Sequence, residues 1–138
     1  MDLDTQLIFV YGTLKNGHKR HDLLAGGKFL DHGTLPSGFV LVDCGGYPGL
    51  IEASSADSHP VSGEIYAVES AHLSVLDEYE AVDSGEYKRV PISVLTRSGN
   101  VINAQTYLFL RHSQAIPVIG GTWELEREKH FRREFPEI

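Results

Sequence analysis

Short apolar runs recur along most of this chain, and glycine, proline or serine cuts most of them off within a few residues. Runs of this length and spacing are typical of β-strands rather than of long helices. The last two runs flank Arg97-Ser98-Gly99-Asn100, which favours a hairpin turn between them. The chain is therefore limited to a strand-rich fold. The runs comprise residues 7–10, 39–42, 49–51, 61–68, 90–95 and 101–110.

Helical spacing is found in fewer places. Ser70 is suited to cap a helix, and Leu73 and Leu76 follow it at helical spacing. Two further helices are predicted over residues 18–25, ending at glycine, and 123–135, ending at proline. Because many strands are combined with few helices, without regular alternation, we expect an α+β fold. Its architecture is predicted to be a small mixed β-barrel or sheet with a few short helices.

The bulk properties fit a single soluble domain. The length of 138 residues suits one domain, which we place over residues 1–138. No run approaches the roughly 18 apolar residues of a membrane span, and the first residues lack the features of a signal peptide. The chain holds one cysteine, which excludes an internal disulfide. We therefore expect a cytoplasmic protein that does not bind membranes.

Charge and motif content exclude several further classes of partner. The formal net charge of -7 argues against nucleic acid, because phosphate binding needs clustered lysine and arginine. The seven histidines form no His-x-x-x-His pair or other compact ligand spacing, so no metal site is predicted. Neither phosphate-loop fingerprint is present, and we expect no cofactor.

The first apolar run ends in a segment that is a candidate for binding or catalysis. It passes directly into Tyr11-Gly12-Thr13-Leu14. A strand that breaks at glycine presents backbone N–H groups without a ladder partner, and such groups can hold an anion or a developing oxyanion. Many strands end at glycine for structural reasons alone. The segment becomes informative only when it is paired with a carboxylate elsewhere in the chain.

The candidate carboxylate is Glu80, at the end of the helix predicted after Ser70. At about 100° per residue, Glu80 falls between the directions of Leu73 and Leu76, on the apolar face, whereas Asp77 lies on the flank. Desolvation and the negative end of the helix dipole would both raise the pKa of Glu80. A raised pKa is what a general base and acid working near neutrality needs.

Other interpretations remain open for the candidate residues. The helix could end before Glu80, which would then face solvent or pair with Lys88 or Arg89. A nucleophilic Cys44 would need a histidine partner that the sequence does not locate. The chain also lacks a Gly-x-Ser-x-Gly elbow, so serine hydrolysis of that kind has no support. Tyr87, Tyr107 and Trp123 are predicted to lie in the core or the pocket wall rather than to act as catalytic groups.

Three motifs in order resemble the gamma-glutamylcyclotransferase superfamily. Residues 9–17, Phe-Val-Tyr-Gly-Thr-Leu-Lys-Asn-Gly, are similar to the N-terminal signature of its gamma-glutamylamine cyclotransferase branch. Residues 61–68 resemble the strand before the family's catalytic helix, and residues 76–80 resemble its Leu-Asp-x-x-Glu pattern. The resemblance covers roughly residues 7–110. The Tyr-Gly-Thr-Leu form differs from the Tyr-Gly-Ser-Asn form of the glutathione-related branch.

The resemblance implies an enzyme that releases 5-oxoproline from a gamma-glutamyl amine or a gamma-glutamylated small metabolite. It implies Glu80 as the catalytic residue and a substrate site that includes Tyr87. The substrate's own α-amine would attack its own γ-carbonyl, so no serine or cysteine nucleophile is needed. Backbone N–H groups of Gly12, Thr13 and Leu14 would receive the oxyanion, within a substrate site that also includes Tyr11. The same loop or a nearby tyrosine hydroxyl would clamp the α-carboxylate.

Two other functions stay open beside this one. The chain could be a non-catalytic member of the fold that binds a small acidic ligand, although a binding module has no need of an inward Glu80. It could also be an unrelated amidase that uses Cys44. The leaving amine and the oligomeric state are not indicated by the sequence. Residues 45–49 are predicted to form the rim of the pocket, on loop composition alone.

Overall fold

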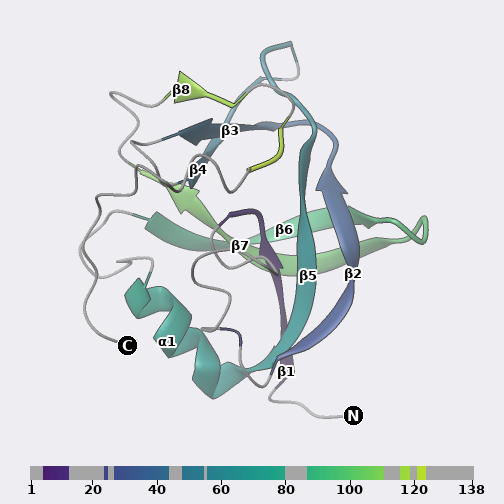
Figure 1. Ribbon diagram of the computed structural model, residues 1–138, viewed down its shortest axis with the longest axis vertical. Helices are drawn as coiled ribbons and strands as arrows, with labels where there is room; N and C mark the ends of the chain where they lie inside the picture. The colour runs from purple at the N-terminus through teal and green to yellow at the C-terminus, as the bar shows by residue number, and fades with distance from the viewer. Residues whose placement is uncertain are drawn as a thin grey trace.

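We describe the fold from a computed structural model of the chain (Figure 1). The structure describes residues 5–12, 24, 27–43, 48–54, 56–79, 87–110, 116–118 and 121–123. Within these residues the elements, in chain order, are β1 (Thr5–Val10), β2 (Lys28–Leu35), β3 (Phe39–Asp43), β4 (Pro48–Glu52), β5 (Val61–Glu69), α1 (Ser70–Tyr79), β6 (Tyr87–Thr96), β7 (Val101–Phe109) and β8 (Ile116–Pro117).

Strands β1, β5, β2, β6 and β7 close, in that order, into a small barrel. The neighbouring pairs are antiparallel except β1 and β7, which run parallel and meet at Ile8 and Gln105. Figure 1 shows β2 and β5 side by side, with β6 and β7 crossing them. The mixed pairing, together with helix α1, confirms the predicted α+β fold built on a small mixed barrel.

A second, smaller sheet has the order β4-β3-β8. It lies beyond one end of the barrel, at the top of the view in Figure 1. Its strands β3 and β4 correspond to the predicted runs 39–42 and 49–51, and they pair antiparallel from Phe39 with Glu52 to Asp43 with Pro48. The short strand β8 was not predicted, because two residues carry no periodic signal.

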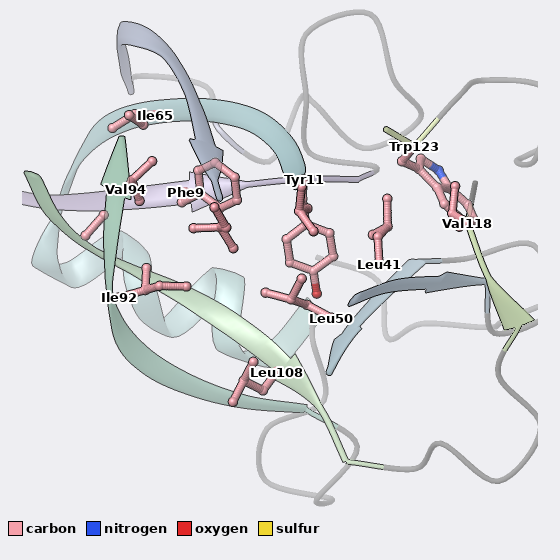
Figure 2. Packing of buried hydrophobic residues seen from close by; sticks show 13 residues of the cluster. Phe9, Tyr11, Leu41, Leu50, Ile65, Ile92, Val94, Leu108, Val118 and Trp123 are labelled. Carbon is pink, nitrogen blue, oxygen red and sulfur yellow. The ribbon is translucent and has the colours of Figure 1, made fainter. Parts of the chain in front are cut away.

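Two buried clusters hold the layers together. Strand β1 feeds both, since Phe9 and Tyr11 belong to one cluster and Ile8 and Val10 to the other. The first cluster fills the barrel and continues between the barrel and the second sheet (Figure 2). The second joins the barrel wall to Leu73 and Leu76 of α1 and to Val40 and Val42 of β3. Alternation along one strand therefore joins the barrel to everything packed around it.

The end of β1 depends on a close approach by β5. A Cβ built on Gly63 would lie 2.4 Å from the carbonyl oxygen of Val10 and 2.6 Å from Cζ of Phe9. Real Cβ atoms do not approach other heavy atoms this closely, so a side chain at this position would have to displace Phe9 from the barrel. Gly63 thus lets β5 support the last residues of β1, directly before the Tyr11-Gly12 break.

The predicted helices and hairpin have different outcomes. Helix α1 begins at Ser70, as predicted, and it buries Leu73 and Leu76. The predicted hairpin is confirmed, because β6 and β7 pair antiparallel from Tyr87 with Phe109 to Leu95 with Val101. The helices predicted over residues 18–25 and 123–135 lie almost wholly outside the described residues, which include only Leu24 and Trp123 of them.

Three further points concern domain organisation, membrane-spanning helices and metal sites. The single domain over residues 1–138 stays a prediction. Across the described ranges, no helix has the length and apolar character that crossing a bilayer requires. Among the same residues, no group of three or more histidine, cysteine, aspartate or glutamate side chains is placed to hold a metal ion.

Candidate active site

Tyr11, the first residue after β1, is fixed by a long-range hydrogen bond. Its hydroxyl donates to the backbone carbonyl of Tyr107 in β7 at 2.8 Å. Its ring is buried and lies between the barrel side chains, such as Phe9, and those of the second sheet, such as Leu41 (Figure 2). Tyr11 therefore fastens the end of β1 to β7, at the place where the predicted donor segment begins.

Gly12 is held against the second sheet. A Cβ at this position would lie 2.2 Å from Cγ of Pro48, the first residue of β4. Its φ is outside the left-handed range, so the close approach, not the backbone conformation, excludes a side chain here. The backbone of Gly12 therefore carries no side chain and packs closely against the ring of Pro48.

Tyr87, the first residue of β6, meets the same proline. Its hydroxyl donates a short hydrogen bond to the carbonyl oxygen of Pro48, and its buried ring packs against Phe109 with centroids 5.2 Å apart. The structure therefore brings Gly12 and Tyr87, both predicted site residues, to the same proline, Gly12 to its ring and Tyr87 to its carbonyl oxygen. Pro48 itself was predicted only as part of a loop over residues 45–49. It begins a strand instead, and residues 45–47 lie outside the described residues.

These contacts limit what the two tyrosines can do toward a ligand. A phenol has one hydrogen to donate. Tyr11 donates its hydrogen to Tyr107 and Tyr87 donates its hydrogen to Pro48. Neither hydroxyl can donate to a substrate carboxylate without breaking that bond.

Helix α1 reaches this region through Asp77. The guanidinium of Arg89 in β6 donates to both carboxylate oxygens of Asp77, from Nε at 2.8 Å and from Nη2 at 3.2 Å. The hydroxyl of Tyr107 donates to Oδ1 of Asp77 at 2.7 Å. The hydrogen bonds to Asp77 are the chief cause of a raised pKa for Arg89. The carboxylate described beside Arg89 is thus Asp77. The pairing of Arg89 with Glu80, one possibility that the sequence suggested, lies outside the described residues.

The remaining predicted site residues lie outside the described residues. These are Thr13, Leu14 and Glu80, together with Cys44 of the alternative amidase. Helix α1 ends at Tyr79, so Glu80 is the next residue along the chain. The catalytic role of Glu80 and the donor roles of Thr13 and Leu14 stay predictions. The positioning contacts of Pro48, Asp77 and Tyr107 were missed, because they depend on partners far away in the sequence.

An open hollow of about 370 Å³ lies on another part of the barrel wall. His32 and Thr34 of β2, Ser62 of β5, and Leu95 and Arg97 at the end of β6 are among its lining residues. Of the predicted site residues, those that the structure describes, Tyr11, Gly12 and Tyr87, are not among its lining residues. These three residues meet around Pro48 instead, and the candidate site is placed there.

Comparison with known proteins gives a consistent result. Residues 8–125 match the family described as gamma-glutamyl cyclotransferase, AIG2-like. The chain is 39% identical over 83 residues to a Vibrio cholerae protein provisionally named a gamma-glutamylcyclotransferase, which covers 60% of this chain and 68% of that protein. It is 35% identical over 94 residues to the gamma-glutamylaminecyclotransferase of Rattus norvegicus. This alignment covers 63% of this chain and 62% of the rat protein.

A solved structure is similar to this fold. The crystal structure of an aig2-like protein from Mus musculus superposes with a TM-score of 0.69 at 29% sequence identity. The superposition covers 80% of this chain and 80% of the mouse chain. The predicted family resemblance is confirmed by these matches, and the fold class is confirmed with it.

Proposed function

Since the chain belongs to the gamma-glutamyl cyclotransferase, AIG2-like family, we propose that it is an enzyme that releases 5-oxoproline from a gamma-glutamyl amide. The observation that carries this proposal is the family match over residues 8–125, which includes both the Tyr11-Gly12 break and Glu80. The chain spans 68% and 62% of the two relatives compared, so the activity of the whole protein is part of the proposal.

The proposed reaction is an intramolecular acyl transfer. The α-amine nitrogen of the substrate attacks its γ-carbonyl carbon, a five-membered ring forms, and the bond to the leaving amine breaks. Because both reacting groups belong to one molecule, holding them in the folded conformation supplies much of the rate. Glu80 accepts the proton that the α-ammonium loses and delivers it to the leaving amine.

The geometry around Gly12 supports the donor half of this proposal. An oxyanion site works best when its donors are held in place before the reaction begins. Tyr11 is tied to β7 by its hydroxyl, and Gly12 is confined by Pro48. We propose that the backbone N–H groups of Gly12, Thr13 and Leu14 receive the carbonyl oxygen as it gains charge, and that they contribute to holding the α-carboxylate.

We further propose that the leaving group is a simple amine. The Tyr11-Gly12-Thr13-Leu14 segment has the form that resembles the gamma-glutamylamine branch, and the similarity to the rat gamma-glutamylaminecyclotransferase agrees with this. A panel of gamma-glutamyl amines, gamma-glutamyl dipeptides and glutathione, scored for 5-oxoproline, tests the choice. We expect kcat/KM for the best amine to exceed that for glutathione by at least about tenfold, which is about 1.4 kcal/mol of transition-state binding.

The mechanism is tested by Glu80→Gln in the full chain. Loss of the general base and acid should lower kcat by about 10²–10⁴-fold while substrate binding is kept. Glu78→Gln is the matched control, because Glu78 is exposed on α1, two positions before Glu80 in the sequence, and should tolerate the change. Full activity of Glu80→Gln would overturn the assignment.

Two further outcomes separate the alternatives. If the wild-type protein binds a gamma-glutamyl compound but never releases 5-oxoproline, the chain is a binding member of the fold. If alkylation of Cys44 abolishes turnover, the cysteine-dependent amidase replaces the cyclotransferase. The proposed mechanism requires turnover of at least one panel member and full activity after alkylation.

A further inference from the structure

We propose that Asp77 is a positioning residue of this enzyme, which couples the end of helix α1 to the Tyr11-Gly12 end of β1 through Tyr107. The inference rests on the proposed function for its catalytic consequence. Its structural content is independent of the reaction, since Asp77, Tyr107, Tyr11 and Gly12 are all described residues. Asp77 is placed in the last turn of α1, three positions before Glu80.

The coupling runs through one residue. Tyr107 donates its hydroxyl to Oδ1 of Asp77 at 2.7 Å, while its backbone carbonyl accepts the hydroxyl of Tyr11 at 2.8 Å. Two hydrogen bonds on one β7 residue therefore connect the helix to the end of β1. A shift of the helix end that broke the first bond would also release the side chain of Tyr107 next to the Tyr11 anchor.

The sheet register explains why Asp77 finds both partners. Arg89 in β6 and Tyr107 in β7 are directly opposite each other in the antiparallel ladder. Side chains of directly opposite residues project from the same face of a sheet. Asp77 lies over that face and takes the forked guanidinium of Arg89 together with the Tyr107 hydroxyl. The carboxylate is thereby held at three points, and its direction is fixed.

A second connection reaches the beginning of β1. Nη1 of Arg89 donates a short hydrogen bond to Oε1 of Gln105, and Nε2 of Gln105 donates to Oε1 of Gln6 at 3.0 Å. Gln105 is also the β7 residue that meets Ile8 where β1 and β7 run parallel. Polar side chains therefore link α1, β6, β7 and β1 along the seam at which the barrel closes.

Burial separates a positioning role from a stabilising one. The side chains of Arg89 and Asp77 are 29% and 26% exposed, and ion pairs that reach solvent contribute little to stability. Leu73 and Leu76 are buried in the core, so we expect the helix to stay packed on the barrel when the pair is lost. In contrast, a displacement of about 1 Å between catalytic groups can cost about 10²-fold in rate. The expected signature is thus a loss of kcat with small changes in KM and in Tm.

The first test is Asp77→Asn in the full chain. Asparagine keeps the size of the side chain but cannot neutralise Arg89 or accept the full guanidinium fork. We expect kcat to fall by about 10–10²-fold, with KM changed less than about threefold. Asp31→Asn is the matched control, because Asp31 accepts two hydrogen bonds from Ser98 and none of the bonds described for it involves Tyr107. Equal losses in both variants would overturn the inference.

A second variant isolates the coupling residue. Tyr107→Phe removes the hydroxyl that binds Asp77 but keeps the ring and the carbonyl that accepts Tyr11. We expect a smaller loss of kcat than in Asp77→Asn, and a double variant close to Asp77→Asn alone, because residues that act as one unit are not additive. Fully additive losses would show that Asp77 and Tyr107 act separately and would contradict the inference.

Hydrogen exchange makes the inference testable apart from activity. Asp77→Asn should increase amide exchange in the last turn of α1 and at Gly12 together, and Asp31→Asn should change neither. If the wild type turns over no panel member but both segments respond, the proposed function fails and the coupling stands. If only the helix responds, the coupling is wrong whatever the activity.

Discussion

The two ends of the β6–β7 hairpin are held by different sets of partners. At the tip, the amide of Thr96 donates to Asn100 at 2.7 Å and the amide of Gly99 donates to Thr96 at 3.0 Å, all within one turn. At the base, Tyr87 and Tyr107 bond to Pro48 and Asp77 from other elements. The tip combines these turn bonds with bonds to β2, where Ser98 donates to Asp31. The base is instead held by residues of the second sheet and of α1, and the candidate site lies at the base.

The largest effect is expected from Gly12→Val, at the base. The new side chain would meet Pro48, because a Cβ at this position lies 2.2 Å from Cγ of that proline. Either β4 or the donor backbone has to move, so we expect the rate of 5-oxoproline release to fall by at least about 10²-fold. Unchanged activity in Gly12→Val would remove the oxyanion role from this segment.

A paired control distinguishes the clash from other causes. Gly12→Ala introduces the same Cβ, and Pro48→Gly removes the ring that it meets. The double variant Gly12→Ala with Pro48→Gly should therefore be more active than Gly12→Ala alone, as measured by 5-oxoproline release under identical conditions. Thr13→Ser should be tolerated, since the role proposed for Thr13 belongs to its backbone.

An intermediate effect is expected from Tyr87→Phe, also at the base. The change removes the hydroxyl that donates to the buried carbonyl of Pro48. Loss of a donor to a buried acceptor should lower the free energy of unfolding by about 1–3 kcal/mol, as measured by urea titration. Tyr66→Phe is the comparison, because its hydroxyl donates to the partly exposed Glu64 at 3.0 Å. A smaller loss for Tyr87→Phe than for Tyr66→Phe would contradict the assignment.

The smallest effect is expected at the tip, from Asp31→Asn. Hydrogen bonds from Ser98 are the chief cause of a pKa for Asp31 below its ordinary value of 3.8. A lowered pKa contributes stability that is present above pH 3.8 and is lost as the pH falls through the lowered value. The wild type should therefore exceed the variant slightly in urea unfolding at pH 6, and the difference should disappear in strong acid. A difference that grows on acidification would contradict this sign.

Local patterns predicted the elements whose signals are contained within them. The strand at residues 61–68, the hairpin and the helix after Ser70 follow from alternation, turn residues and helical spacing. Strand β2 was missed because Phe29 and Leu30 are exposed, its register shifts between Phe29 and Asp31, and Gly33 interrupts its centre. None of these features gives the period of two that identifies a strand.

The candidate site was predictable to the same extent. Tyr11-Gly12 could be found because a strand that stops at glycine is visible in the sequence. The role of Pro48 could not, because its neighbours Gly12 and Tyr87 are brought to it by the packing of the second sheet on the barrel. Asp77 was placed on the flank of its helix, but its partner Arg89 is selected by the β6–β7 register.

The parallel seam between β1 and β7 has a consequence for how the protein refolds. The bond from Tyr11 to Tyr107 joins residues 96 positions apart, so the seam carries contacts of very long sequence separation. Such contacts form slowly, while the β6–β7 hairpin can form from adjacent residues. Strand β1 and strand β7 must pair before Gly12 and Tyr107 are brought into one site. Recovery of turnover after dilution from denaturant therefore reports closure of the barrel, and it should follow the recovery of strand signal in circular dichroism.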